Sequence, residues 1–366
     1  MTTPSQLPVF SEGEGDALFA HNRRIAINHV AVILQARIGS SRLPGKVLAD
    51  LAGRPMLAFL VERLKRCTSV NQCILATTQL AEDDDLAELG ESLGLTVVRG
   101  SQNDVLSRFA LAAEHIDAQT LVRITGDCPF VDPGLLDEMV QEFRGQEIDY
   151  FSNCASPTYP DGIDIEIFTR RALLMAQAQC ADAYQREHVT AWIHDSGRCK
   201  LGQKRHHTDY SQMRWTVDEP EDLQVIRAVV AHFEGRSDFS WQDVLELTQQ
   251  QPQLFTANAK FARNEGASMG QGQKLWRRAK RVIPGGNMLL SKRAEMFLPE
   301  QWPAYFSRAK GCRVWDLDGR ELIDMSIMSV GTNLLGYGHP EVDAAVAATV
   351  AAGNMSTLNC PEEVWL

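Results

Sequence analysis

The sequence predicts an α/β protein whose mostly parallel sheet is covered by helices on both faces. From His29 to about residue 249, short apolar runs rich in β-branched residues alternate with amphipathic stretches of helical period. Proline stands where several of these helices should begin, a position that tolerates proline. This alternation favours a parallel sheet with helices on both faces, which binds its ligands at the carboxyl ends of the strands.

The expected elements follow one another along the chain with short connections. Strands are predicted at Val30–Leu34, Cys73–Thr77, Thr96–Val98, Leu121–Ile124, Asp149–Ser152 and Arg214–Val217. Helices are predicted at Met56–Cys67, Asp84–Leu93, Val105–His115, Pro133–Phe143 and Pro220–His232. The prolines at helix starts are Pro55, Pro133 and Pro220.

The chain length and a change of composition near residue 250 indicate two domains. A chain of 366 residues is too long for one ordinary hydrophobic core. We expect a mobile tail at 1–28, a first domain at 29–249, a polar linker at 250–270 and a partial second α/β unit at 271–366. The second unit should begin with a basic helix at Gln273–Val282 and contain a hairpin with an Asp318-Gly319 turn.

Composition argues against nucleic acid or a membrane as a partner. The formal net charge is −11, and no apolar run reaches the roughly 18 residues that span a bilayer. The polar N-terminus lacks the apolar core of a signal peptide. Eight cysteines form no CxxC pair, which predicts free thiols in a reducing cytoplasm.

The stretch that follows the first strand has the composition of a phosphate-binding loop. It carries three cations and no acid, and its small residues let the backbone bend around an anion. It is not a Walker A loop, because five residues separate Gly39 from Gly45 and Val47 stands at the magnesium-binding position. The cations are Arg37, Arg42 and Lys46, and the small residues are Gly39, Ser40, Ser41 and Gly45.

Two aspartates follow apolar strands at positions suited to a metal ion. Asp127 comes after Leu121–Ile124, and Asp218 comes after Arg214–Val217. Magnesium is commonly held by one or two carboxylates together with substrate phosphates. Each aspartate could instead be a helix N-cap, but beside the cationic loop we favour metal binding. Nucleophilic hydrolase chemistry has no support, since the chain contains no GxSxG motif.

A third acidic group lies at residues 160–166. Asp164 and Glu166 alternate with isoleucines, so they should share one face of a strand. This strand could be a solvated antiparallel edge, or its acids could bind the acceptor or a metal. The separate run Glu82–Asp85 indicates a helix start, where acids complement the helix dipole.

Several motifs occur in order along residues 29–249, and together they resemble a known family. They are Gln35-Ala36-Arg37, Ser41 to Leu48, Gly53 to Met56, Arg99 to Arg108, Gly126 to Pro129, Tyr159 to Glu166, Arg186 to Thr190 and Thr216 to Leu223. This set is similar to the cytidylyltransferases that make CMP-activated acidic sugars, and most of all to the spore-coat polysaccharide biosynthesis protein F type. The resemblance implies a GT-A-like, nucleotide-diphospho-sugar transferase fold. It also implies an enzyme that joins CTP to an anionic sugar or small acid and releases pyrophosphate.

The resemblance also implies roles for individual residues. Arg37, Arg42 and Lys46 would hold the triphosphate, while Asp127 and Asp218 would hold Mg²⁺. The other candidate substrate-binding residues are Gln35, Gly39, Ser40, Ser41, Asp104, Arg108, Asp161, Asp164, Glu166 and His188. From spacing alone, Asp104 and Arg108 could equally form an i,i+4 ion pair, and His188 could be a packing or capping group. The acidic-sugar enzymes carry an acid where this chain has Cys128, so the acceptor is left open.

Residues 271–366 resemble the start of a class III, pyridoxal-phosphate-dependent aminotransferase of the glutamate-1-semialdehyde aminomutase type. The resemblance rests on Ile283 to Asn287, Gly311 to Gly319, Ile323-Asp324 and Leu335 to Pro340. In that family the cofactor lysine lies further along, so pyridoxal phosphate is expected only if a longer chain completes this domain. The alternative function is therefore a bifunctional protein that is also an aminotransferase. A homodimer is considered as the assembly state.

Overall fold

The computed structural model describes residues 29–40, 42–261, 263, 270–299, 301–325 and 333–353. The expected tail at 1–28 and the predicted site residue Ser41 lie outside the described residues. The chain divides into two compact units, the first ending at Arg263 and the second beginning at Asn264. Within the described ranges, none of the helices combines the length and the apolar character needed to cross a membrane.

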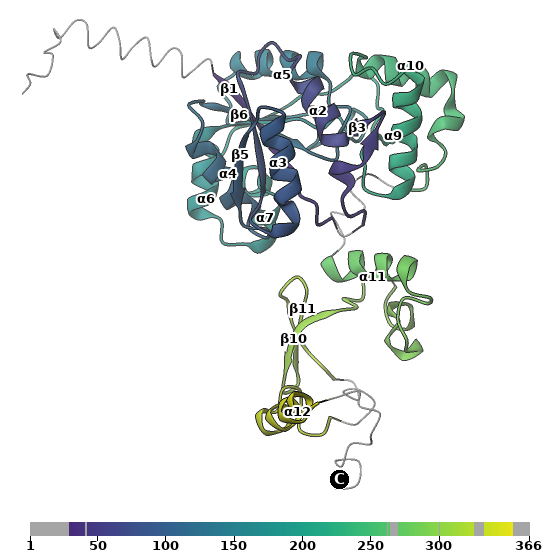
Figure 1. The fold of residues 1–366 in the computed structure, drawn as a ribbon. Coiled ribbons are helices and arrows are strands. Elements are labelled where there is room, and N and C mark those ends of the chain that lie inside the picture. Colours follow the sequence, from purple (N-terminus) through teal and green to yellow (C-terminus); the bar gives the residue numbers. More distant parts are fainter. Residues whose placement is uncertain are drawn as a thin grey trace, which may run out of the picture. The chain divides into compact units, whose positions relative to one another are not determined.

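The first unit is built on a seven-stranded sheet with the order β5-β4-β1-β6-β8-β7-β9 (Figure 1). Strand β8 runs antiparallel to both of its neighbours, and the remaining pairs are parallel. The strands are β1 Val30–Gln35, β4 Gln72–Thr78, β5 Thr96–Gly100, β6 Thr120–Thr125, β7 Tyr150–Ser152, β8 Glu166–Thr169 and β9 Leu201–Gln203. A small hairpin, β2 Asp50–Leu51 and β3 Arg54–Pro55, lies outside this sheet.

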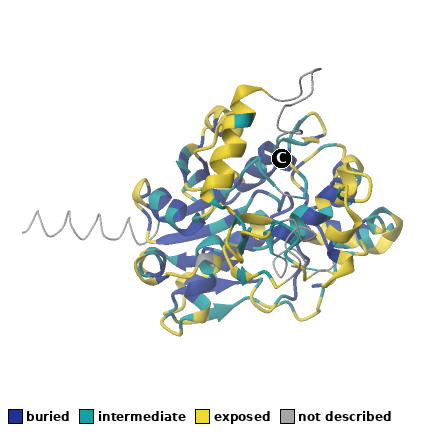
Figure 2. Ribbon diagram, turned by 90° about the horizontal axis from the view of Figure 1, so that it is seen from below, coloured by how far each residue is buried: buried dark blue, intermediate teal, exposed yellow. Residues whose placement is uncertain are grey.

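Alternate residues of β1 face two different hydrophobic cores. Val32 belongs to one core and its neighbour Ile33 to the other, as expected for a strand with both faces covered. Figure 2 shows buried strands enclosed by helices with exposed outer sides. The first core contains side chains of α2 Met56–Leu64, α3 Asp84–Ser92, α5 Pro133–Arg144, α9 Pro220–His232 and α10 Trp241–Gln250. The second contains side chains of α4 Val105–Glu114, α6 Arg170–Gln179 and α8 Ala191–Asp195. The predicted α/β fold is confirmed.

Two strand predictions fail for physical reasons. Residues 214–217 form no strand, because their backbone bonds to two separate segments: Trp215 N donates to Asp161 O at 2.6 Å and Val217 N donates to Asp127 O at 2.8 Å. The solvated-edge interpretation of the acidic segment is also wrong, because β8 lies between β6 and β7 and Glu166 is buried. Strand β9 was not predicted.

Gly162 allows two distant segments to lie against each other. Its φ is +106°, and a Cβ at this position would collide with the backbone of Trp215 and Thr216. Only glycine fits such a close approach without strain. Through this contact, Asp161 is placed beside the segment that leads into Asp218.

The second unit has a small hydrophobic core. The predicted hairpin is present, since β11 and β12 pair antiparallel and Gly319 has a φ of +80°. Its buried side chains include Trp276, Ala279 and Ala294. Its elements are α11 Gln271–Val282, β10 Phe306–Lys310, β11 Arg313–Asp316, β12 Glu321–Ile323 and α12 Pro340–Ala352. The remaining short elements of the chain are α7 Ala183–Glu187 and the 3-10 helices η1 Lys46–Leu48, η2 Ala81–Asp83, η3 Pro252–Phe255, η4 Leu290–Lys292 and η5 Ala294–Met296.

Candidate functional site

The loop after β1 is held in shape by its own backbone and by Asp83. The carbonyl oxygen of Ile38 accepts hydrogen bonds from Ser40 N at 2.7 Å and Gly45 N at 3.0 Å. The Ile38 N–H donates to Asp83 Oδ1 at 2.6 Å. Gly45, with a φ of +73°, then turns the chain into η1, so that Lys46 begins this short helix. The loop therefore presents Lys46 from a fixed backbone.

Lys46 joins the two aspartates that were predicted as metal ligands. Its Nζ lies 2.9 Å from Asp127 Oδ2 and 2.9 Å from Asp218 Oδ1, and it also donates to Val217 O at 2.7 Å. Arg42 approaches the same Asp218 Oδ1 at 2.7 Å. The structure thus brings Arg42, Lys46, Asp127 and Asp218 together at the carboxyl ends of β1 and β6, where α/β sheets bind their ligands.

The N-cap interpretation of these aspartates is wrong. The N-cap of α5 is Asp132, and the N-cap of α9 is Glu219. Asp127 instead follows the tight turn at Gly126, where a Cβ would come within 2.9 Å of Ala36 Cβ. Both carboxylates are therefore available for a role other than helix capping.

The charges of this cluster support one another. Burial alone would lower the pKa of Lys46, but Asp127 and Asp218 hold this pKa well above its ordinary value. Burial would raise the pKa of Asp218, but Lys46 and Arg42 outweigh burial and lower it. The pKa of Asp127 is likewise lowered, because Lys46 outweighs burial and the like charge of Asp218. All three groups are charged at neutral pH.

Arg214 and Asp222 form a second layer around Asp218 that was not predicted from the sequence. Arg214 contacts Asp161 Oδ2 at 3.0 Å and Asp218 Oδ2 at 3.4 Å. It also donates two hydrogen bonds of 2.9 Å to the fully buried carboxylate of Asp222. Burial would lower the pKa of Arg214, but Asp222, Asp161 and Asp218 raise it. Predicted Asp161 is therefore linked to Asp218 through Arg214.

The other two acids of the 160–166 segment are paired with arginines. Asp164 forms an ion pair with Arg263, which also donates to Tyr159 O at 2.8 Å. Glu166 forms an ion pair with Arg123, whose Nε donates to Gln35 Oε1 at 3.1 Å.

Glu166 is also held by two hydroxyl groups. It accepts hydrogen bonds from Tyr150 Oη at 2.7 Å and Thr190 Oγ1 at 2.5 Å. Burial would raise the pKa of Glu166, but Arg123 and these hydroxyls lower it. His188 follows α7 and packs on the Tyr184 ring, with 4.3 Å between ring centroids. Its backbone oxygen accepts from Thr190 Oγ1 at 3.4 Å.

Arg37 and Arg108 lie apart from the ion pairs around Lys46. Among the described residues, Arg37 has no ion-pair partner. Arg108 is buried, and its guanidinium donates to Ser101 O at 3.1 Å. Burial, together with Arg37, lowers the pKa of Arg108 to about 10. The suggested i,i+4 ion pair is wrong, because Asp104 pairs with Arg186 instead, at 2.9 and 2.7 Å.

The small residues of the loop have backbone and packing roles in this structure. Ser40 Oγ accepts from Leu43 N at 3.4 Å. A Cβ on Gly39 would collide with the carboxylate of Glu82. The remaining predicted loop residue, Ser41, is not among the described residues.

The carboxylates of Asp127 and Asp218 fit a divalent cation. Both already contact one cationic group, the Lys46 ammonium, so they can converge on a single positive charge. In the described part of the chain, no group of three or more acids, histidines or cysteines is arranged as a complete metal site. Two carboxylates leave positions for phosphate oxygens and water, as magnesium sites commonly do.

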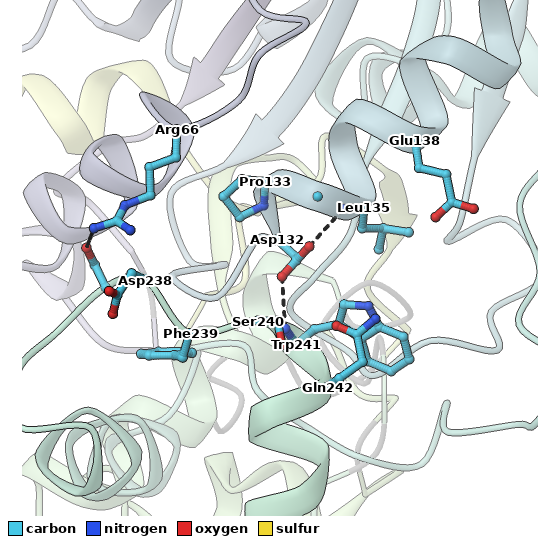
Figure 3. A pocket seen from close by; sticks show the side chains of 12 residues that line it. Arg66, Asp132, Pro133, Leu135, Glu138, Asp238, Phe239, Ser240, Trp241 and Gln242 are labelled. Carbon is cyan, nitrogen blue, oxygen red and sulfur yellow. Dashed lines mark hydrogen bonds between the residues drawn. The ribbon is translucent and has the colours of Figure 1, made fainter.

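A pocket of about 320 Å³ opens where α5 and α10 begin, and two of its charged side chains, Asp132 and Arg66, are already hydrogen-bonded (Figure 3). The Asp132 carboxylate accepts from Leu135 N at 2.8 Å and Trp241 N at 2.9 Å. Arg66 donates to Ser237 Oγ at 3.3 Å. None of the residues that line this pocket belongs to the predicted site, so we place the candidate site at the cluster around Lys46.

The ionisation of Asp161 should make stability depend on pH. Burial and the nearby Asp164 raise the pKa of Asp161 to about 7, against the opposing pull of Arg263 and Arg214. The folded state thus holds this proton more tightly than the unfolded state does. The contribution of this proton to the free energy of unfolding is complete below about pH 4 and is lost as the pH rises to about 7. In this range the free energy of unfolding should fall with a slope that approaches about 1.4 kcal/mol per pH unit.

Urea unfolding at several pH values tests this prediction. Asp161→Asn copies the neutral carboxyl group, so we expect the variant to lose this part of the pH dependence. Asp117→Asn, at an exposed position, should keep the wild-type profile. Equal slopes for wild type and Asp161→Asn between pH 4 and 7 would contradict the prediction.

Comparisons with known proteins identify the family of this chain. Residues 31–258 match the protein family described as Cytidylyltransferase. The spore coat polysaccharide biosynthesis protein SpsF of Bacillus subtilis is 32% identical over 238 residues, which cover 63% of this chain and 98% of that protein. A 3-deoxy-manno-octulosonate cytidylyltransferase of Trichlorobacter lovleyi is 33% identical over 117 residues, 32% of this chain and 45% of that protein.

A solved structure is similar over the same region. The cytidylyltransferase from Leptospira borgpetersenii has 33% sequence identity and a TM-score of 0.60, covering 63% of this chain and 97% of that chain. The family match extends over well more than half of the sequence and includes all the residues around Lys46. The chain therefore belongs to the cytidylyltransferase family of nucleotidyltransferases.

Proposed function

We propose that this protein transfers CMP from CTP to an anionic sugar or small acid in a magnesium-dependent reaction, as a step in surface-glycan or related biosynthesis. The observation that carries the proposal is the contact of Lys46 with both Asp127 and Asp218 at the end of a cationic loop. The name of one relative, a 3-deoxy-manno-octulosonate cytidylyltransferase, supports an acidic sugar as acceptor, and the name of the spore-coat protein supports polysaccharide biosynthesis.

In the proposed reaction an oxygen of the acceptor attacks the α-phosphorus of CTP. The bond from this phosphorus to the bridging α–β oxygen breaks, and pyrophosphate leaves. Arg42 and Lys46 would hold the triphosphate in line for this attack, since nucleotidyl transfer depends mainly on positioning and on neutralised charge. Asp127 and Asp218 would hold Mg²⁺, which would neutralise charge that develops on the phosphates.

Arg37 and Arg108 supply further positive charge for an anionic substrate. Arg108 is 1% exposed, and its Nε has no hydrogen-bond partner among the described residues. A buried cation with no ion-pair partner among the described residues is costly, so an anionic ligand would stabilise it. The substrate-binding roles of Gln35, Asp104, Asp164, Glu166 and His188 stay predictions.

A turnover screen tests the proposal. Each of the four nucleoside triphosphates is combined with Mg²⁺ and a panel of anionic sugars that includes 3-deoxy-manno-octulosonate, and pyrophosphate release is measured. We expect release with CTP that requires both the acceptor and the metal. Release with another nucleotide only would overturn the choice of cytidine, and absence of turnover across a broad panel would overturn transferase activity.

The aminotransferase resemblance of residues 271–366 also stays a prediction. Binding of pyridoxal phosphate by the purified protein, measured by equilibrium dialysis, tests it separately from nucleotide chemistry.

A further inference from the structure

The segment that follows α10 reaches back to the network around Asp218. Asn258 is 2% exposed, and its Nδ2 donates to Arg214 O at 3.1 Å and to Asp222 Oδ1 at 2.9 Å. Just before Asn258, Leu254 and Phe255 of η3 pack on the main core. Just after it, the Phe261 ring faces the Arg214 guanidinium, with 5.8 Å between the guanidinium carbon and the ring centroid. At the end of the segment, Arg263 forms an ion pair with Asp164. Asn258, Phe261 and Arg263 therefore contact the acids and arginines of the candidate site.

Asp222 receives more hydrogen bonds than a helix cap needs. Its Oδ2 accepts from the backbone N–H groups of Asp218 and Glu219, each at 2.9 Å. The same carboxylate accepts from Arg214 and from Asn258. The Glu219 contact belongs to the capping box of α9, but the bond to Asp218 N fixes the backbone of the proposed metal ligand itself. Asn258 completes this arrangement from 36 residues away.

We propose that Asn258 is a positioning residue for nucleotidyl transfer: through Asp222 and Arg214 it fixes the Asp218 carboxylate where a metal–nucleotide complex binds. The inference rests on the proposed function. Groups that orient metal-binding carboxylates without touching the metal matter because loss of one typically costs about 10- to 100-fold in affinity or activity. Through Asn258, the segment after α10 thereby contributes to the enzyme's site.

Asn258→Asp tests this inference, because the side chain keeps its size while an oxygen replaces the donating nitrogen. Binding of CTP to the full chain without acceptor is measured by calorimetry, once with Mg²⁺ and once with EDTA. We expect the Mg²⁺-dependent gain in CTP affinity to be about tenfold smaller in the variant than in wild type. Its affinity in EDTA should stay within about twofold of wild type. We also expect kcat to fall about tenfold while KM for the acceptor is unchanged.

Two comparisons keep the test decisive. Lys260→Ala removes an exposed ion pair with Glu221 in the same segment and should behave as wild type in both measurements. Asn258→Ala, whose smaller side chain removes the donor without adding a charge, should show the same loss of the Mg²⁺-dependent gain. An unchanged gain in both Asn258 variants would overturn the positioning role, even if their unfolding temperature falls. If wild type itself gains nothing from Mg²⁺, the proposed function fails before the role of Asn258 is reached.

Discussion

Asp218→Asn is expected to lower pyrophosphate release from CTP by about 100-fold or more. The Asp218 carboxylate contacts Lys46, Arg42 and Arg214, and a neutral amide would weaken all three contacts. It would also remove one of the two charges proposed to hold Mg²⁺. Asp127→Asn should have a loss of the same order, since its carboxylate shares Lys46 with Asp218. The measurement is initial-rate pyrophosphate release at saturating CTP and acceptor.

The double variant should add little to either single loss. Residues that act as one unit are strongly non-additive, so the second change removes contributions already lost with the first. Asp117→Asn, an exposed aspartate, serves as the matched control and should keep full activity. Full turnover in both Asp127→Asn and Asp218→Asn would contradict the proposed metal site.

Lys46→Met is expected to destabilise the first unit by about 3 kcal/mol or more. The side chain is 9% exposed and satisfies two carboxylates and the Val217 carbonyl oxygen. Methionine has a similar length but no charge, so the variant would leave Asp127 and Asp218 close together without their shared cation. Removing one partner of a buried ion pair is costly because the other charge stays buried. Urea unfolding at pH 7 without metal measures the effect.

A divalent cation should restore part of this loss. In Lys46→Met the two carboxylates have lost a counter-charge, so Mg²⁺ alone should raise the unfolding midpoint of the variant more than that of wild type. Lys200→Met changes an exposed lysine and should alter neither stability nor its response to Mg²⁺. A variant as stable as wild type, with no response to Mg²⁺, would show that Lys46 does not balance the two aspartates.

The fold and the centre of the candidate site could be predicted because both follow from local patterns. Strand and helix periods identify a parallel sheet, and the carboxyl ends of neighbouring parallel strands meet at one edge. This places the loop after β1 near Asp127, which follows β6, as the structure has it. Asp218 was found for a partly wrong reason, since residues 214–217 form no strand but still bond to the backbone of Asp127.

The second layer of the site could not be predicted, because its contacts join residues with no periodic relation. Asn258 and Asp222 meet only when the chain after α10 folds back. The local expectation for Asp104 and Arg108 failed for a similar reason, since Arg186, 82 residues away, takes the Asp104 carboxylate. Helical spacing makes a pair possible, but tertiary packing decides which partner is used.

The Lys46 ammonium already serves as the counter-ion of Asp127 and Asp218. It should therefore affect the order in which metal and nucleotide bind. A bare divalent ion gains little by entering, since the negative charge it would meet is already balanced. If Mg²⁺ entered bound to a nucleoside triphosphate, Asp127 and Asp218 would hold the ion, and the Lys46 ammonium would bind the phosphates instead of the two carboxylates. We therefore expect the nucleotide-free enzyme to bind free Mg²⁺ weakly and to bind Mg²⁺ and nucleotide together as a complex.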